Sequence, residues 1–373
     1  MKWRKVVAVV ISAVCVFALA GCSTSNQTGG GNTEEETVKT ESGDSAAEID
    51  WSKLPEGWNN PNIEQPARSG KEAPSKVADD GKITIGWCPP EMLPYYELVL
   101  KGVNEAIEEI GEDKIELVVQ APANQASGAT EQLNIIENWV SQDFDAIIVS
   151  ATDDGMLNAA FQKASEKGIA IIEFNMPQEL IQNDYYVANC SPSGYDAGLA
   201  MGKWLVERHP DAKDVKVAII EGIAGLHTNL RQEGFIKTLE ENGGFEIVAS
   251  QPADWNRDKA ASVIENILTA NPDIDVIYAL YDDMALGTVS VIESKGMSGQ
   301  IEVLGYDMTP EGLEAIKSGK MTASVYNGAR QMGYDSVMAA YKYMAEGTMV
   351  PKLICGEPVV VDQESAASFT AFE

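Results

Sequence analysis

From Lys82 onward, short apolar runs alternate with stretches in which apolar residues recur every three or four positions. Runs such as ITIGWC, FDAIIVSA and GIAIIEFN are nearly continuous in apolar residues, which is typical of strands buried on both faces. The intervening stretches, residues 97–110, 129–141 and 155–166, have helical spacing. The alternation predicts an α/β fold with parallel sheets that helices cover on both sides.

A second cycle of the same kind starts near Asp196. Helical spacing at residues 197–208, 230–242 and 257–269 alternates with strand-like runs, among them VKVAIIEGIAG and FEIVASQPA. After Gly319, two further strand-like runs and one helix are too few for a third domain. We therefore predict two doubly wound parallel-sheet lobes that the late elements complete, with several chain crossings between them that form a hinge.

The predicted N-terminal lobe covers residues 82–189 plus 328–357, and the C-terminal lobe covers residues 190–327 plus 358–373. Between residues 22 and 80 the chain is rich in Ser, Thr, Gly, Asn and Glu, so we expect an acidic flexible tether that cannot bury a core by itself. Trp51 and Trp58 are exceptions, and we expect this part of the tether to lie against the folded body.

The first residues have the features of an export signal. Three basic residues precede an apolar run over residues 6–20, which is too short for a stable membrane span. The run ends in LAGC, which resembles a bacterial lipobox. Residues 1–21 are therefore predicted to be a lipoprotein signal peptide, with Cys22 as the lipidated residue of a protein anchored on the extracytoplasmic face of the membrane.

Charge and composition exclude several classes of protein. The formal net charge of -30 disfavours nucleic acid and anionic lipid as partners. Three cysteines follow residue 80, and we interpret Cys88, Cys190 and Cys355 as small apolar residues without a redox or metal role. With only His209 and His227, the chain lacks the material for zinc motifs or histidine-based triads, so we expect no metal and no cofactor.

Two of the predicted strands end in an aromatic residue followed by an acid, Tyr281-Asp282 and Tyr306-Asp307. Ligands of open α/β sheets bind outside the carboxyl ends of the strands, so both pairs are expected near a small-molecule site. Asp282 and Asp283 directly precede a helical stretch, and we expect one of them to be a helix N-cap rather than a ligand contact.

Several motifs in the same order resemble the periplasmic sugar-binding proteins of the ribose and galactose type, namely GIAGLHTNLRQEGF, SQPADWNRDKA, YDDMALG and VLGYDMTPEG. The resemblance covers roughly residues 82–362. It implies two lobes joined by a three-crossover hinge, a sugar trapped between them, and delivery to an ABC importer. LacI-type repressors share these lobes, but a signal peptide and tether stand here in place of their DNA-binding segment.

In this family, paired aromatic residues stack on the sugar ring, and Tyr95 and Tyr96 match them; packing at a helix start is the alternative. Asn175 stands where ribose binders carry an acid followed by arginine, and Met176 replaces that arginine. This departure removes the ribose contact pattern, although Asn175 still offers a donor and an acceptor. A plain turn residue remains the other interpretation of Asn175.

On the C-terminal lobe, the resemblance assigns Arg231 to bidentate contacts with sugar oxygens, which suit its planar guanidinium. Trp255 matches a stacking position, with core packing as the alternative. Tyr281 replaces an asparagine of the ribose binders, and would enlarge the aromatic wall or narrow the cleft. Asp307 matches the family's sugar-binding carboxylate and Asn327 an amide contact, whereas loop capping and a turn are their alternatives.

His227 lies near the expected cleft, but a solvent-exposed loop histidine is the preferred interpretation. Although Asp282, Asp283 and Asp307 raise the question of glycosidase chemistry, no second acid beside a scissile bond is identifiable. We therefore expect a non-enzymatic, monomeric solute-binding lipoprotein that passes a monosaccharide or similar polyol to an ABC permease. The alternative is a ligand sensor that presents its closed form to a membrane signalling receptor.

Overall fold

The structure is a computed structural model that describes residues 49–55, 57–58, 65–66, 78, 81–123 and 128–369. The predicted signal peptide, the lipidation site Cys22 and most of the predicted tether lie outside these residues. Within the described part of the chain, no helix is both long and apolar enough to cross a membrane.

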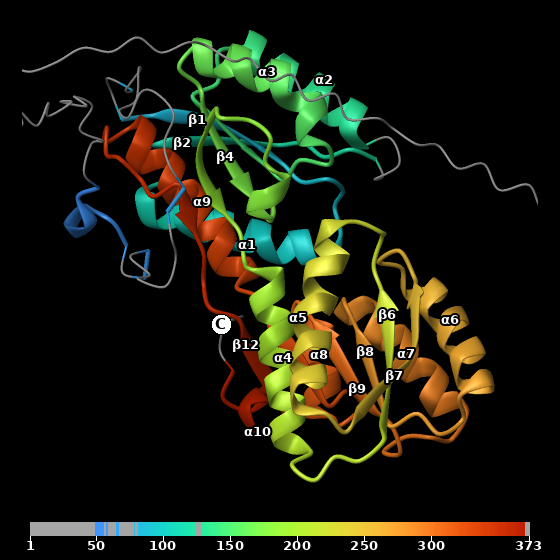
Figure 1. Ribbon diagram of the computed structural model, residues 1–373. Helices are drawn as coiled ribbons and strands as arrows, with labels where there is room; N and C mark the ends of the chain where they lie inside the picture. The colour runs from blue at the N-terminus through green and yellow to red at the C-terminus, as the bar shows by residue number, and fades with distance from the viewer. Residues whose placement is uncertain are drawn as a thin grey trace, which may run out of the picture. The chain divides into compact units, whose positions relative to one another are not determined.

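The first lobe is built on a sheet of six described strands in the order β11-β5-β4-β3-β1-β2, all parallel. Helices α2 and α3 cover one face, and α1 and α9 pack together on the other (Figure 1). The bounds are β1 Ile83–Cys88, α1 Pro94–Ile110, β2 Ile115–Val119, α2 Gly128–Ser141, β3 Ala146–Val149, α3 Asp154–Glu166, β4 Ala170–Phe174, η2 Gln178–Leu180, β5 Tyr186–Cys190, α9 Ala329–Met344 and β11 Leu353–Ile354.

The second lobe repeats this plan with six described strands in the order β12-β10-β9-β8-β6-β7, of which β12 alone is antiparallel. Helices α4 and α5 lie side by side on one face, and α6 and α7 on the other (Figure 1). The bounds are α4 Gly194–Arg208, β6 Val215–Glu221, α5 Leu226–Asn242, β7 Phe245–Pro252, α6 Arg257–Ala270, β8 Val276–Ala279, α7 Asp282–Ser294, β9 Glu302–Tyr306, α8 Pro310–Lys317, β10 Ala323–Tyr326, β12 Val359–Asp362 and α10 Gln363–Ala366.

Three crossings connect the lobes within the described residues: after β5, after β10 and between β11 and β12. The predicted α/β class with two doubly wound parallel-sheet lobes is thus confirmed. The residue-level lobe bounds stay a prediction.

Several helices begin earlier than the apolar spacing indicates. Helix α1 starts at Pro94 rather than at residue 97, because proline is well suited to a first helical turn, where its missing N–H has no helical partner. Helix α5 starts at Leu226 rather than at residue 230. These extra turns carry Tyr95, Tyr96 and His227, so they place polar groups at the carboxyl ends of β1 and β6.

Trp58 packs against the first lobe with only 4% of its surface exposed, and its indole N–H donates to Asp335 of α9 at 2.8 Å. The expectation that this part of the N-terminal segment lies against the body is confirmed for Trp58. Gln65 adds two bonds to the backbone of Leu353, one donated at 2.8 Å and one accepted at 3.0 Å. These two side-chain bonds pair the backbone N–H and C=O of Leu353 in the edge strand β11.

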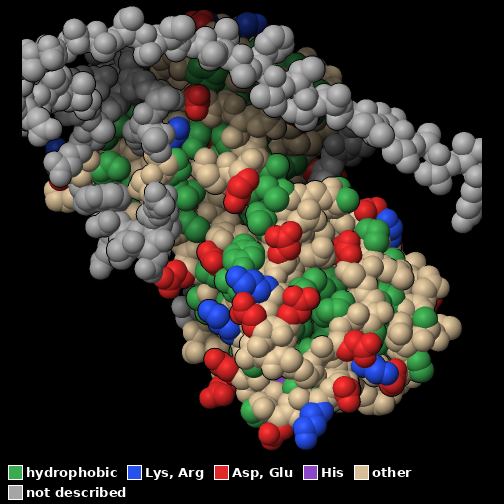
Figure 2. All heavy atoms as spheres, in the orientation of Figure 1, with side chains coloured by type: hydrophobic (Ala, Val, Ile, Leu, Met, Phe, Trp, Pro, Cys, Tyr) green, Lys and Arg blue, Asp and Glu red, His purple; other side chains and the backbone are tan. Residues whose placement is uncertain are grey.

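The face of the second lobe that Figure 2 shows carries charged side chains of both signs. Acidic and basic side chains are interspersed over the second lobe on the face that Figure 2 shows. Several of them form exposed ion pairs, such as Arg208 with Glu302 at 2.7 Å. Exposed pairs of this kind contribute little to stability, so they mainly keep the surface solvated.

Candidate functional site

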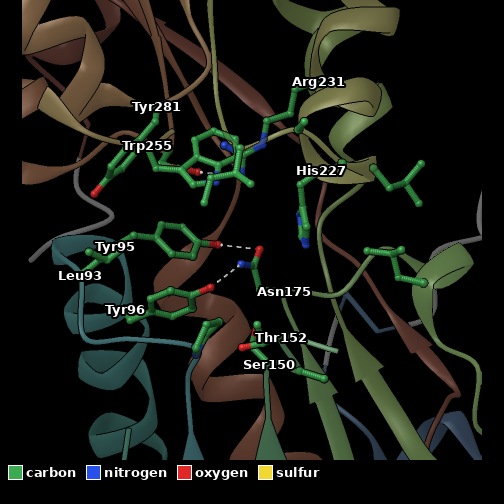
Figure 3. Close-up of a pocket in the computed structure, with 18 residues that line it drawn as sticks. Leu93, Tyr95, Tyr96, Ser150, Thr152, Asn175, His227, Arg231, Trp255 and Tyr281 are labelled. Atoms are coloured by element: carbon green, nitrogen blue, oxygen red, sulfur yellow. Dashed lines mark hydrogen bonds and ion pairs between the residues drawn. The ribbon is translucent and has the colours of Figure 1, made fainter. Parts of the chain in front are cut away.

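A cavity of about 610 Å³ lies between the lobes, at the carboxyl ends of β1, β3, β4, β6, β8 and β9. Its position agrees with the general rule for ligand sites in open α/β sheets. Polar and aromatic side chains from both lobes point into it (Figure 3). The lining includes Leu93, Tyr95, Tyr96, Ser150, Thr152, Asn175, Leu180, Ile223, Leu226, His227, Arg231, Trp255, Tyr281 and Asp307.

The first-lobe wall is a chain of neutral hydrogen-bonding groups. The Tyr95 hydroxyl donates to Asn175 Oδ1 at 3.3 Å, and Asn175 Nδ2 donates to the Tyr96 hydroxyl at 3.1 Å (Figure 3). All three side chains are less than 9% exposed. Asn175 has a left-handed backbone, with φ of 51°, and this turn after β4 directs its amide toward the tyrosines.

The second-lobe wall carries the charges of the cavity. Arg231 Nη2 lies 3.6 Å from Asp307 Oδ1, and Arg231 Nη1 donates to the Leu280 carbonyl at 2.6 Å. The guanidinium also lies over the Tyr306 ring, 3.8 Å from its centroid. Burial raises the pKa of the Asp307 carboxyl to about 6, although Arg231 and Asn327 act in the opposite direction. A buried cation and anion thus face the cavity as a pair.

Asn327 does not line the cavity. It lies behind Asp307, where its Nδ2 donates to Asp307 Oδ1 at 2.8 Å and contacts the Tyr95 hydroxyl at 3.4 Å. The structure therefore brings Asn327 to the site as a partner of two lining side chains from different lobes, rather than as a lining residue itself.

Two aromatic side chains form the wall next to Arg231. Trp255 is half-buried, and its ring centroid lies 5.1 Å from the Arg231 guanidinium carbon. Tyr281 meets Trp255 edge to face, with ring centroids 6.5 Å apart. Figure 3 shows both rings on the same side of the cavity, opposite Asn175. Of the two alternatives for Tyr281, an aromatic wall agrees with this arrangement.

The structure corrects the interpretation of His227 as a solvent-exposed loop residue. His227 lies in the first turn of α5, lines the cavity and points into it (Figure 3). Burial, together with the nearby Arg231 cation, lowers the pKa of its imidazole to about 3. The imidazole is therefore neutral at physiological pH and offers one donor and one acceptor.

The predicted helix cap at Asp282 or Asp283 is wrong. Both residues lie inside the first turn of α7, and Tyr281 occupies the N-cap position without a side-chain cap bond. Asp283 instead accepts a hydrogen bond from Arg257 Nε at 2.7 Å, whereas Asp282 is fully buried behind the turn that carries Asp307. The sequence around the start of α7 does not predict this difference, because nothing in it distinguishes two adjacent acidic residues.

Some of the residues that line the cavity were not predicted from the sequence. Leu93, Leu180, Ile223 and Leu226 lie in or beside loops that end strands, where single aliphatic residues have no periodic pattern. They give the cavity an apolar component next to its polar walls. Ser150, directly after β3, could have been found by the strand-end argument that identified Asp307.

The side chains that meet here are suited to binding. No group of three or more His, Cys, Asp or Glu residues that could hold a metal occurs within the described residues. Cys88 and Cys190 are buried free thiols away from the lining, and Cys355 is half-buried. Paired charges, neutral amide and phenol groups and flat rings together match an uncharged ligand that has both hydroxyl groups and C–H faces.

Comparison with known proteins gives a consistent result. A family model described as a periplasmic binding protein domain matches residues 85–348. The ribose import binding protein of Bacillus subtilis is 27% identical over 269 residues, which cover 72% of this chain and 83% of that protein. The fructose import binding protein of Bifidobacterium longum is 24% identical, over 98% of this chain and 96% of that protein.

Solved structures have the same fold. An ABC transporter solute binding protein from Actinobacillus succinogenes with bound D-allose matches with a TM-score of 0.71 and 29% identity, over 77% of this chain and all of that one. A solute binding protein from Bacillus halodurans with bound myo-inositol matches with a TM-score of 0.69 and 25% identity, over 78% of this chain and 98% of that one.

Proposed function

We propose that this chain, which belongs to the periplasmic binding protein family, captures a monosaccharide or similar polyol between its lobes. It then delivers this ligand to an ABC import permease. The observation that carries the proposal is the buried pair of Arg231 and Asp307 in a cavity that aromatic rings line. No chemical step is part of this function.

The chemistry of the cavity favours a neutral polyol. A carboxylate accepts hydrogen bonds from sugar hydroxyls, and a guanidinium donates two in a fixed plane. Because Arg231 and Asp307 balance each other and His227 is neutral, a charged ligand would bring an unpaired charge into a buried site. The ribose import binding protein is named for a ligand of this neutral type, and the two similar solved structures hold D-allose and myo-inositol.

Each predicted site residue has a proposed role. Asp307 and Arg231 contact vicinal hydroxyls, while Asn175 and the hydroxyl groups of Tyr95 and Tyr96 contact the opposite side of the sugar. Trp255 and Tyr281 pack against its C–H faces, and Asn327 orients Asp307. Since these residues come from both lobes, a ligand that contacts all of them stabilises the closed arrangement of the hinge, which a permease can recognise.

A thermal-shift screen tests the proposed ligand class. D-ribose, D-allose, D-fructose and myo-inositol are added to the purified protein, and at least one is expected to raise the melting temperature in a concentration-dependent way. Asp307→Asn serves as the matched control and should reduce the shift. If no sugar or cyclitol shifts the wild-type melting temperature, the proposal is wrong. Recovery of the unmodified sugar after long incubation checks that no turnover occurs.

We further propose that the mature chain is a monomer, anchored to the extracytoplasmic face of the membrane through a lipid on Cys22. The basic start, the apolar run and the LAGC ending support this anchor. Cys22→Ala should move the protein from the membrane fraction to the soluble fraction and leave sugar affinity unchanged. Continued membrane association of this variant contradicts the anchor but not the binding function.

A further inference from the structure

The turn that carries Asp307 has a backbone that side-chain-bearing residues rarely adopt. Asp307 has φ of 95° and Met308 has φ of 51°, two consecutive non-glycine residues with positive values. Such a conformation costs free energy and persists only where the surroundings hold it. A single backbone bond, from the Asp307 N–H to the Val325 carbonyl at 2.8 Å, fixes the first residue of the turn.

The carboxylate of Asp282 holds the rest of this turn. Its Oδ2 accepts hydrogen bonds from the Thr309 N–H at 2.6 Å and from the Thr309 hydroxyl at 3.3 Å. Its Oδ1 accepts from the Ser324 hydroxyl at 2.6 Å, and Ser324 Oγ in turn accepts from the Met308 N–H at 3.3 Å. Asp282 therefore holds Thr309 directly and Met308 through the Ser324 hydroxyl.

Two glycines make room for this carboxylate. A Cβ atom at Gly305 would collide with Asp282 Oδ1, and a Cβ atom at Gly312 would collide with Asp282 Oδ2. The carboxylate thus lies in a slot between β9 and α8 that a side chain at either glycine would close. Asp282 is 0% exposed and does not line the cavity, so any effect on a ligand must pass through the turn.

We propose that Asp282 is a positioning residue for ligand binding: it keeps residues 307–309 in the strained conformation that presents the Asp307 carboxylate to the cavity. The inference builds on the proposed function, because ligand affinity is one of its readouts. Asp283 is the neighbouring acid in the same helical turn, but it pairs with Arg257 outside the cavity and provides a matched control.

The first experiment compares Asp282→Asn with Asp283→Asn by titration calorimetry, using the sugar that gives the largest thermal shift among D-ribose, D-allose, D-fructose and myo-inositol. Asparagine keeps the shape of the side chain but replaces one of the two oxygens by an NH₂ group, which cannot accept from the Thr309 donors or from the Ser324 hydroxyl. Asp282→Asn should weaken binding about tenfold or more, as expected for a lost buried hydrogen bond to a charged group. Asp283→Asn should stay within about twofold of the wild type. Equal affinities of the two variants overturn the proposal.

A double-mutant cycle separates positioning from a general structural effect. If Asp282 acts through Asp307, then Asp282→Asn should cost little further affinity in an Asp307→Asn background. If Asp282 only stabilises the lobe, the two losses add, and the positioning role is refuted. Should Asp282→Asn fail to fold, Ser324→Ala replaces it, because this change removes the donor to Asp282 Oδ1 and the acceptor of the Met308 N–H.

Amide hydrogen exchange of the ligand-free protein gives a readout that needs no sugar. In the Asp282→Asn variant, the Met308 and Thr309 amides should exchange about tenfold faster or more, while those of β8 and β9 keep their protection. If no sugar binds the wild type but this local change occurs, the proposed function fails and the role of Asp282 in holding the turn stands. Unchanged exchange at both amides overturns that role.

Discussion

Two turns from different lobes line the cavity, and they have similar sequences but different charges. Strand β4 ends at Phe174 and is followed by Asn175-Met176, and strand β9 ends at Tyr306 and is followed by Asp307-Met308. In each turn the aromatic residue and the methionine are buried, and the central polar residue has positive φ. The first turn presents an uncharged amide, whereas the second presents a carboxylate beside a buried guanidinium.

The supports behind the turns differ as well. Asp154 and Asp282 both begin the helix that precedes their turn in sequence, α3 and α7. Asp154 accepts bonds from the Gln182 N–H at 2.6 Å and from Asn183 Nδ2 at 2.8 Å, several residues beyond Asn175. Asp282 holds Thr309, two residues after Asp307.

This contrast indicates how binding free energy is divided between the lobes. Asp307 is buried and its turn is held directly, so we expect its carboxylate to relax little when a partner is removed. Asn175, in contrast, already has the Tyr95 and Tyr96 hydroxyls as hydrogen-bond partners, so it keeps partners when no ligand hydroxyl is present. We therefore expect substitutions in the second lobe to weaken binding more than equivalent substitutions in the first.

The largest effect is expected for Asp307→Ala. This change leaves Arg231 buried without its counter-ion and ligand hydroxyls without an acceptor, which should cost about 3 kcal/mol of binding free energy, or roughly a hundredfold in affinity. Calorimetry measures the loss, and circular dichroism checks that the protein is folded. Unchanged affinity in a folded variant would show that the site is assigned to the wrong residues.

The next effect concerns pH and should come from the second turn alone. Ligand hydroxyls need the ionised carboxylate, so affinity should fall about tenfold between pH 8 and pH 5, since burial raises the pKa of Asp307 to about 6. Asp307→Asn should reduce this pH dependence to the part that Asp282 contributes, since burial raises the pKa of Asp282 to about 7, whereas Asn175→Ala should keep the shape of the profile. A wild-type affinity that does not change with pH would contradict the proposed electrostatic difference between the two turns.

The stability of the ligand-free protein should have the opposite pH dependence. Because the pKa of Asp307 is higher in the folded chain than its ordinary value of 3.8, its contribution to stability is complete below that value and is lost as pH rises through about 6. Burial also raises the pKa of Asp282, to about 7, so its contribution has the same sign at slightly higher pH. Denaturant unfolding across this pH range measures the sum of the two contributions to stability. The variants Asp307→Asn and Asp282→Asn separate the contribution of each residue.

A smaller effect is expected for Asn175→Ala. This change removes neutral hydrogen bonds, which are worth about 1 kcal/mol each, and affinity should fall roughly fivefold. The measurement uses the same sugar as for Asp307→Ala. If Asn175→Ala costs more than Asp307→Ala, the division of binding free energy between the lobes is the reverse of our proposal.

The smallest effect is expected for Asp154→Asn. Because Asp154 holds residues 182 and 183 rather than the neighbours of Asn175, affinity should change less than about twofold. Asp282→Asn in the equivalent position is the matched comparison. A loss as large as that of Asp282→Asn would mean that both helix-start acids position the ligand turns.

The amino-acid sequence alone was sufficient to predict the alternation of strands and helices and their arrangement in two lobes. Apolar runs of strand length and helical spacing are local patterns, and burial of both sheet faces follows from them. The strand-end rule also identified Asp307, because parallel strands place their carboxyl ends at one edge. The predicted helix starts were less accurate, because the periodic spacing of apolar residues does not extend into first turns that contain proline or polar residues.

The roles of Asp282, Asp283 and His227 depended on contacts between segments distant in the chain. Asp282 meets Thr309 and Ser324, which lie 27 and 42 residues further on, and only the tertiary packing of the second lobe brings them together. Asp283 points instead toward Arg257, 26 residues earlier. Side chains one position apart on a helix point in different directions, so one acid of the pair is buried behind the ligand turn and the other reaches the surface.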